Sequence, residues 1–321
     1  APGFLEDQIK FSLTVELTRI TFPFLLFVSL SSFFAGILNS NNKFAAAAAA
    51  PIILNVVLIF SLVYSFIQSL DYAKQLSYGV TIAGIIQLFF LIYVTKKFYK
   101  PSINFNLKLS SKVKFFFKKL LPSILSSGVT QINILVGTII ASFQTGAISY
   151  LYYADRVYQI NLAIAGIAVG TVSLPVLSKA FKMKNVKKIS NIQNKSFELS
   201  MLFSIPASFG LILASNEIVN SLFGYGSFSL NDVEMTASAL KLFGYGVPAF
   251  ALIKILSNFY FARDNTKIPF YISLFIVFLN ILISVTLFNK IGFLIIPIAT
   301  SISTWIGVFI YIYLLNSKKI L

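Results

Sequence analysis

Long apolar runs constrain the fold of this chain more than any other feature. The stretch YISLFIVFLNILISVTLF at residues 271–288, for example, carries no charged side chain. A helix rises about 1.5 Å per residue, so about 20 apolar residues cross the hydrocarbon layer of a bilayer. Runs of this kind predict spans at Phe11–Leu38, Phe44–Gln68, Tyr78–Thr95, Leu120–Phe143, Ile148–Leu177, Phe197–Ser215, Val233–Phe261, Ile268–Phe288 and Phe293–Leu315.

These spans are expected to be helices rather than strands of a membrane barrel. Barrel strands alternate apolar and polar residues over about ten positions, because one face meets lipid and the other a polar interior. The runs in this chain are apolar on all sides. We therefore predict an all-α polytopic membrane protein with about nine spans.

Composition excludes several classes of function. Hydrophobic residues make up 57% of the chain and charged residues 11%, whereas soluble domains are about 25% charged. The sequence contains no Cys or His, which excludes disulfides, Cys/His metal sites and thiol or imidazole catalysts. It also lacks a GxxxxGKS/T loop and a carboxylate cluster suited to a metal-dependent lipid transferase. These absences favour a transporter without a resident cofactor over an enzyme.

The basic residues indicate how the spans are oriented. The net charge of +16 is distributed between apolar runs rather than on one solvated domain, so we predict no nucleic-acid partner. If nine spans alternate in direction, 19 of the 26 Lys and Arg residues fall in loops on one side and three in loops on the other. Basic loops stay on the cytoplasmic side. The split therefore places residue 1 outside the cytoplasm and residue 321 inside it.

Two stretches of the sequence share one pattern. Pro23 precedes Asn55 by 32 residues, and Pro248 precedes Asn280 by the same 32. A short polar turn with a lysine lies between the two residues of each pair. Each copy is expected to be a kinked span, a tight turn and a second span with an Asn at mid-membrane depth. Six spans separate the copies, which is typical of a transporter built from two parallel repeats.

The most polar span contains the segment YYADRVYQ, with Asp155 and Arg156 in its outer half. Arg binds phosphate bidentately and stays charged, so an Arg156 side chain directed into a cavity would bind a phosphate or pyrophosphate. The alternatives are a structural Asp–Arg pair and an Arg whose head extends to the membrane surface. Gln159 is three residues from Arg156 and is expected on the same surface. Gly166 and Gly170 follow as a small-residue stripe.

Other polar groups at membrane depth have two interpretations each. Lys254, midway along its span, either faces a central cavity or packs against a helix carbonyl. Glu16 and Arg19 are three residues apart and are expected to form a structural salt bridge. Asn55 and Asn280 either bond neighbouring helices or contribute to a cation site.

Several segments resemble the MurJ/MviN family of lipid II flippases. They are APGF at the start, RITFPFLLFVSLSSFFAGILNSNNKF, the P-x3-N pattern at Pro51–Asn55, YYADRVYQ at 152–159, GTVSLPVLSKAF at 170–181 and FYFARDNTKIP at 259–269. The motifs follow the family order over nearly the whole chain.

The resemblance implies the MOP-exporter fold, in which two six-helix lobes related by a pseudo-twofold repeat are followed by two more helices. This chain would cover the fourth to twelfth of the fourteen helices, with the N-terminal three and C-terminal two missing. Residues 1–99 would complete the N-lobe with three spans, and residues 120–321 would form the six-span C-lobe. Residues 100–119 would be a basic amphipathic cytoplasmic linker, with a regulatory or lipid-binding role as the alternative.

The resemblance also implies a function. Family members move lipid II from the inner to the outer leaflet by alternating access, for peptidoglycan synthesis, and a monomer among membrane lipids is expected. A cationic cavity holds the pyrophosphate–sugar head, and the arginine of the YYADR motif is Arg156 here. Asp155, Gln159 and Lys254 are the neighbouring candidates. Some members have an acidic residue at the position of Gln159, and further family arginines lie on helices outside this sequence.

The source of energy stays open at this point. Some family members bind sodium with Asp and Asn side chains of the seventh, eleventh and twelfth helices. Asn280 matches the Asn, and Thr300 is a further candidate ligand. Gly137 and Ser284 stand where carboxylates would be expected. Coupling to Na⁺, to H⁺ or to the membrane potential is therefore considered.

Two other functions are weighed against flipping of lipid II. A related MOP exporter would move polysaccharide-linked lipids or drugs, and substrate competition in binding would separate the two. A membrane-embedded enzyme of polyprenyl-phosphate chemistry would need a carboxylate or His cluster at one membrane face, which the sequence does not show.

Overall fold

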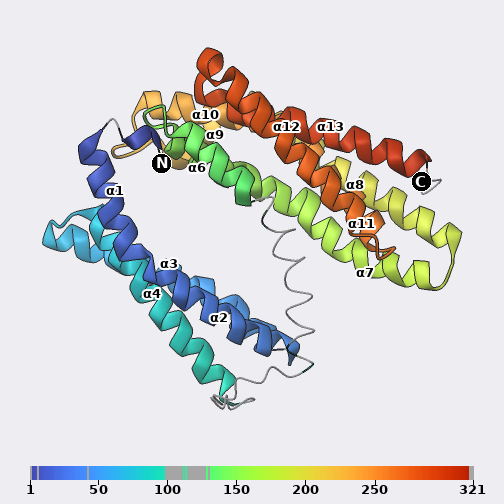
Figure 1. Ribbon diagram of the computed structural model, residues 1–321, viewed down its shortest axis with the longest axis horizontal. Helices are drawn as coiled ribbons and strands as arrows, with labels where there is room; N and C mark the ends of the chain where they lie inside the picture. Colours follow the sequence, from blue (N-terminus) through green and yellow to red (C-terminus); the bar gives the residue numbers. More distant parts are fainter. Residues whose placement is uncertain are drawn as a thin grey trace. The chain divides into compact units, whose positions relative to one another are not determined.

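The computed structural model describes residues 2–5, 7–41, 43–97 and 131–317, with the single residues 111, 113 and 128. Within these ranges every regular element is a helix (Figure 1), which confirms the predicted all-α class. The chain forms two compact units, Phe4–Ser110 and Ala1–Gly3 with Ser111–Leu321. Nearly all of the predicted linker at 100–119 lies outside the described residues, so the division into lobes and linker stays a prediction.

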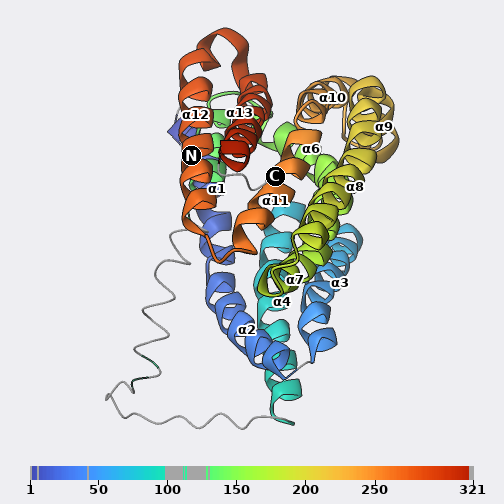
Figure 2. The same cartoon turned by 90° about the vertical axis from the view of Figure 1, so that its right-hand side faces the viewer.

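Six helical stretches among the described residues are long and apolar enough to cross a membrane. They are Gln8–Ser40, Phe44–Gln68, Tyr72–Thr95, Ala147–Lys182, Val186–Leu213 and Lys267–Ser317. The last stretch contains two helices, α12 (Lys267–Ile291) and α13 (Ile295–Ser317), which pack along each other on either side of the tight turn η3 (Gly292–Leu294; Figure 2). The chain is therefore a multi-pass membrane protein.

A seventh candidate span is a bent pair of helices. It consists of α10 (Leu230–Gly244) and α11 (Val247–Phe261), whose axes differ by 42°. The predicted span Leu120–Phe143 lies partly outside the described residues. Its described part contains the short apolar helix Gln131–Ala141. The number of nine spans therefore stays a prediction.

The first unit, Phe4–Ser110, consists of α1 (Gln8–Thr21), α2 (Pro23–Ser40), α3 (Phe44–Gln68) and α4 (Tyr72–Thr95). The short turn η1 (Pro2–Phe4) comes before α1 in the chain, and most of it belongs to the other unit. Helix α4 packs against each of the other three helices. Its buried face carries small residues, including Ser77, Gly79, Ala83 and Gly84. Small side chains let membrane helices approach closely, which explains how α4 contacts three neighbours.

The α1–α2 stretch is interrupted at Phe22, directly before Pro23. A proline ring has no N–H to donate and is tolerated in the first turn of a helix, so the interruption falls where the sequence predicts it. The hydroxyl of Thr81, on α4, donates to the carbonyl oxygen of Ile20 at 2.6 Å. A side chain from a neighbouring helix thus satisfies a carbonyl group beside the break.

The second unit contains the remaining helices of the described residues. They are α6 (Ala147–Leu162), the π-helical turn η2 (Ala163–Ala168), α7 (Val169–Lys182), α8 (Val186–Leu213) and α9 (Ser215–Phe223), followed by α10 to α13. Pro248 lies in the first turn of α11, as Pro23 does in α2. The predicted helix interruption at both prolines is confirmed.

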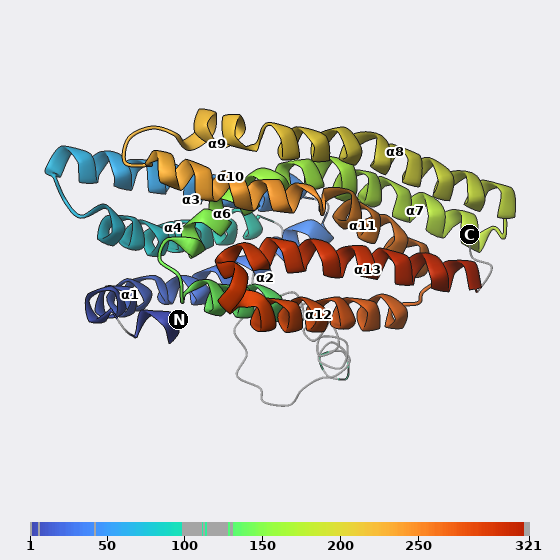
Figure 3. The same cartoon turned by 90° about the horizontal axis from the view of Figure 1, so that it is seen from above.

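The ends of α7 and α8 differ from the sequence-based expectation. We expected a basic loop over residues 179–195, whereas α7 continues to Lys182 and α8 begins at Val186, and the two helices pack along each other (Figure 3). The side chain of Asn185 caps α8 by accepting from the backbone N–H of Lys188 at 3.0 Å. The helices therefore extend beyond the apolar runs, which mark only the membrane-embedded part.

Candidate functional site

The α6 helix, which carries the YYADR motif, is fixed at its start to α10. Gly146 adopts a φ of 77° directly before α6, a conformation that favours glycine. The hydroxyl of Tyr150 donates to Asp232 at 2.9 Å, and Asp232 forms a capping box with Ser229 at the start of α10. Ala154 and Val157 bury the inner face of α6 in the apolar core. The polar residues between them are thereby held toward the outer face.

The Asp155 carboxylate interacts with two neighbours on the same helix. The side-chain amide of Gln159 donates to one of its oxygens, and the hydroxyl of Tyr158 lies near enough to this carboxylate to interact with it electrostatically. The sequence places Gln159 beside Arg156, but its hydrogen bond in the structure goes to Asp155. The reason is the i,i+4 spacing of Asp155 and Gln159, which places the two side chains one helical turn apart.

Arg156 presents an exposed guanidinium group. Its Cζ atom lies 4.7 Å from the centre of the Tyr152 ring, one turn earlier on α6. A cation over an aromatic face is held electrostatically and keeps its hydrogen-bond donors free for an anion. Arg156 forms no salt bridge with an Asp among the described residues, in which the only ion pair is the one between Lys74 and Glu16. The Arg156 head is therefore available to a ligand, as a binding role requires.

Tyr158 connects this cluster to the bend between α10 and α11. Its ring stacks on Phe243 at the end of α10, with centroids 4.8 Å apart and ring planes inclined by 21°. It also contacts Phe250 in the first turn of α11, at 5.4 Å between centroids. The side chain that interacts with Asp155 thus packs against both sides of the bend. Tyr158 was not among the predicted site residues, although its position within YYADRVYQ was a signal.

The bend itself releases backbone carbonyls that three side chains satisfy. The hydroxyl of Ser208 on α8 donates to Gly244 at 2.7 Å. From α13, the hydroxyl of Ser301 donates to Leu242 at 2.9 Å, and the Trp305 indole N–H donates to Tyr245 at 2.9 Å. Carbonyl groups at membrane depth must find partners inside the protein. Nothing in the sequence pattern links these donors to the bend, so they were missed.

The glycine stripe after α6 allows close contact with α11. A Cβ atom on Gly166 would lie 3.1 Å from the Cα of Ala251, and one on Gly170 would lie 3.1 Å from the side-chain nitrogen of Asn258. That amide donates to the Gly170 carbonyl oxygen at 2.8 Å. Gly166 lies within η2, and π-helical turns occur frequently at functional sites.

Lys254 stands on α11 with an exposed side chain, whereas the opposite face of the helix buries Leu252, Ile255 and Leu256. The structure shows no contact between Lys254 and the Asp155–Gln159 pair among the described residues. Its assignment to the substrate site therefore stays a prediction.

Asn280 and Thr300 do meet, as interhelical partners. The Asn280 amide nitrogen on α12 donates to the Thr300 hydroxyl on α13 at 2.8 Å. The Ser284 hydroxyl donates to the side-chain oxygen Oδ1 of Asn280 at 3.4 Å, which is long for a hydrogen bond. Among the described residues no group of three or more Asp, Glu, His or Cys side chains is placed to hold a metal. The cation role of Asn280 and Thr300 stays a prediction, since the pair already serves as a helix–helix bond.

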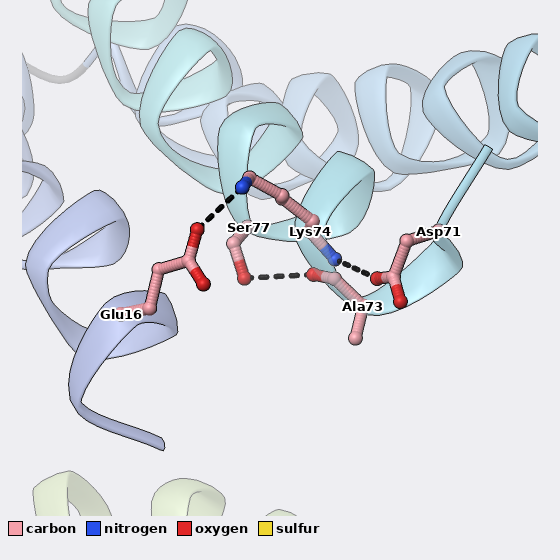
Figure 4. Close-up of polar contacts among 5 residues, drawn as sticks. All are labelled: Glu16, Asp71, Ala73, Lys74 and Ser77. Atoms are coloured by element: carbon pink, nitrogen blue, oxygen red, sulfur yellow. Dashed lines mark hydrogen bonds and ion pairs between the residues drawn. The ribbon is translucent and has the colours of Figure 1, made fainter. Parts of the chain in front are cut away.

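The expected Glu16–Arg19 salt bridge is wrong. The Glu16 carboxylate on α1 instead pairs with the Lys74 ammonium group on α4 (Figure 4). Lys74 lies in the first turn of α4, where Asp71 caps the helix by accepting from the Lys74 backbone N–H at 2.7 Å. The packing of α1 on α4 brings the lysine to Glu16, a long-range contact that spacing along α1 does not reveal.

The arrangement of these helices is shared with solved transporter structures. A solved structure described as the inward-facing conformation of a multidrug resistance MATE family transporter of the MOP superfamily aligns with 99% of this chain and 74% of its own, with a TM-score of 0.83. Its sequence identity of 15% shows the fold alone.

Sequence comparison then gives the family. The sequence model described as "Lipid II flippase MurJ" matches residues 1–321, and the chain therefore belongs to the lipid II flippase MurJ family. A protein described as a probable lipid II flippase MurJ from Rhizobium tropici is 39% identical over 96% of this chain, and one from Rickettsia prowazekii is 39% identical over 100% of it. The solved structure "Lipid II flippase MurJ, inward closed conformation" aligns over 98% of the chain with 29% identity and a TM-score of 0.83.

The chain spans only part of the length of these proteins. It covers 58% of the Rhizobium relative, 63% of the Rickettsia relative and 64% of the solved MurJ chain. The activity and substrate of the whole protein are therefore proposed below.

Proposed function

We propose that this chain acts in a flippase that moves lipid II from the inner to the outer leaflet of the bacterial inner membrane by alternating access. Membership of the family supports the substrate. The fold supports the transport mode, because MOP-type transporters share it. The basic loops support an orientation with residue 1 on the periplasmic side and residue 321 in the cytoplasm.

The observation that carries the proposal is the exposed Arg156 on α6, held over Tyr152 with no carboxylate at salt-bridge distance among the described residues. A guanidinium group donates two parallel hydrogen bonds to a phosphate and does not titrate. Asp155 and Gln159 bond each other beside it and offer polar groups to a sugar. We assign the diphosphate of the lipid to Arg156 and its sugars to the neighbouring polar surface, while the polyprenyl tail stays in the bilayer.

The test is Arg156→Ala in the complete protein, assayed for lipid II translocation and for complementation of a strain that lacks the flippase. Removal of a charged hydrogen-bonding group costs about 1.5–3 kcal/mol, so transport is expected to fall at least tenfold. Lys290→Ala removes an exposed cation from the end of α12 and is the matched control. Normal translocation and complementation by Arg156→Ala would remove Arg156 from the mechanism.

A related MOP exporter for other lipids or for drugs is the second candidate, since the fold is shared with a multidrug transporter. Competition between lipid II, a polysaccharide-linked lipid and a cationic drug for binding to the purified protein separates the two. We propose transport without chemical turnover, by a monomer, and recovery of intact lipid after translocation checks the first point.

The driving force is proposed to come from Na⁺, H⁺ or the membrane potential. Asn280 and Thr300 are the candidate cation ligands, because the long hydrogen bond from Ser284 holds the side-chain oxygen of Asn280 only weakly. Translocation into vesicles with each gradient imposed in turn distinguishes these sources.

A further inference from the structure

A pocket of about 540 Å³ lies between α1 and α4 in the first unit. Its α1 wall includes Ser12, Glu16 and Arg19, which recur every three to four residues and so share one face of the helix. Tyr78 contributes from α4. The volume is within the range of about 300–1,000 Å³ that small-molecule sites occupy. It is large enough for a diphosphate with part of a sugar.

The pocket carries an uncompensated positive charge. Glu16 is three residues before Arg19 and would neutralise it, but the Glu16 carboxylate is bound to the Lys74 ammonium group (Figure 4). Within the described residues no carboxylate lies at salt-bridge distance from Arg19. Charged groups within membrane spans are costly and mark partners or substrates. The ion pair between the helices therefore leaves the Arg19 guanidinium for an anion.

The other groups in the pocket fit a sugar as well as a phosphate. The Ser12 hydroxyl donates to Ile9 at 2.9 Å and keeps its acceptor capacity. The Glu16 carboxylate has further lone pairs for sugar hydroxyls, and Tyr78 and Phe11 offer aromatic faces to the apolar side of a sugar ring. A simple phospholipid head would use the arginine alone, whereas a glycosyl diphosphate would use the whole wall.

We propose that the α1–α4 pocket is a subsite for the glycosyl-diphosphate head of the transported lipid, with Arg19 bound to the diphosphate. This inference rests on the proposed function and adds to it a binding element from the first unit.

Site-specific photo-crosslinking in the complete protein tests the assignment. A benzophenone amino acid in place of Tyr78 is expected to crosslink to lipid II in membranes. The same group in place of Tyr72 is the control, because six residues at 100° each place it about 120° around α4 from Tyr78. Equal crosslinking at the two positions, or none at Tyr78, would overturn the subsite.

Binding measurements identify the ligand and the residue. Lipid II, phosphatidylglycerol and inorganic pyrophosphate are compared on the purified protein and on Arg19→Ala, with retained helicity checked by circular dichroism. The mutation is expected to weaken lipid II binding about tenfold and to change phosphatidylglycerol binding little. An equal loss for phosphatidylglycerol would assign the pocket to bulk lipid, and full-strength binding of pyrophosphate alone would exclude the sugar contacts.

Two further variants keep the test decisive. Glu16→Gln removes the carboxylate and frees Lys74, so diphosphate binding should become tighter, and weaker or unchanged binding contradicts the charge argument. Arg156→Ala separates the proposed α1–α4 subsite from the proposed flippase function. If Arg156→Ala loses binding and Arg19→Ala does not, the subsite fails while the flippase function stands. If the unaltered protein binds no lipid II, the proposed function itself fails.

Discussion

Gly166 and Ala251 lie so close that a Cβ atom on the glycine would stand 3.1 Å from the Cα of the alanine. The contact joins the π-helical turn η2 to α11 backbone to backbone, a short distance along the chain from the Asp155–Gln159 pair. A side chain at this position would push the two backbones apart by a few tenths of an ångström, which makes the contact sensitive to added bulk.

Gly166→Val is expected to destabilise the protein by about 1–3 kcal/mol, because an overpacked contact against backbone cannot relax by moving one side chain. Thermal unfolding of the purified protein measures the effect. Gly210→Ala, in α8, is the matched control, since no atom lies within 4 Å of its Cβ position. It should be neutral or stabilising by up to about 1 kcal/mol. Similar losses for both variants would contradict a specific contact.

Tyr158→Phe and Tyr158→Leu separate the two roles of the tyrosine. The phenylalanine keeps the stacking on Phe243 and Phe250 but removes the hydroxyl that interacts with Asp155. We expect near-normal thermal stability and weaker lipid II binding from Tyr158→Phe. Tyr158→Leu should also lower stability, by about 1–3 kcal/mol, because the aromatic contacts are lost. Unchanged binding in Tyr158→Phe would show that the hydroxyl does not position Asp155.

Ser301→Ala leaves the Leu242 carbonyl without its side-chain donor at the α10–α11 bend. A buried unsatisfied carbonyl costs about 1–3 kcal/mol, and we expect a loss of that size in unfolding free energy. Ser303→Ala is the control. The Ser303 hydroxyl donates to the backbone carbonyl oxygen of Thr300 in its own helix, and that oxygen also accepts a hydrogen bond from the Thr304 hydroxyl. Equal effects of the two substitutions would argue against a special role for the bend.

Asn280→Ala and Thr300→Val, singly and together, measure the bond between α12 and α13. Hydrogen bonds between membrane helices contribute about 0.6 kcal/mol on average, so the coupling in a double-mutant cycle should be of that order. Repeating the cycle with and without Na⁺ tests the cation site. A site would make the unaltered protein more stable as Na⁺ rises, whereas a purely structural bond would leave the coupling unchanged.

Features governed by local chemistry were predictable from the sequence. The spans follow from runs of apolar residues, and the helix interruptions at Pro23 and Pro248 follow from the missing proline N–H. For Asn280 the sequence left two interpretations, an interhelical hydrogen bond and a cation site. The hydrogen bond from its side-chain amide to Thr300 agrees with the first.

Features that depend on packing between distant segments were not predictable. Glu16 pairs with Lys74 rather than Arg19 because α1 packs on α4, which no spacing within α1 encodes. The segment that forms η2, AIAGIA, has an ordinary helical composition, so nothing indicates a π-helical turn. The donors at the bend come from α8 and α13 and are visible only in three dimensions.

The hydrogen bonds to Leu242, Gly244 and Tyr245 carry one more consequence. Three donors on two different helices each hold one oxygen of the bend. A hydrogen bond weakens steeply once its distance and angle depart from their narrow optimum. Straightening the bend would lengthen or break these bonds and leave the carbonyl groups of α10 and its C-terminal end without side-chain donors. The three bonds therefore oppose a change in the angle between α10 and α11, and they tie that angle to the positions of α8 and α13.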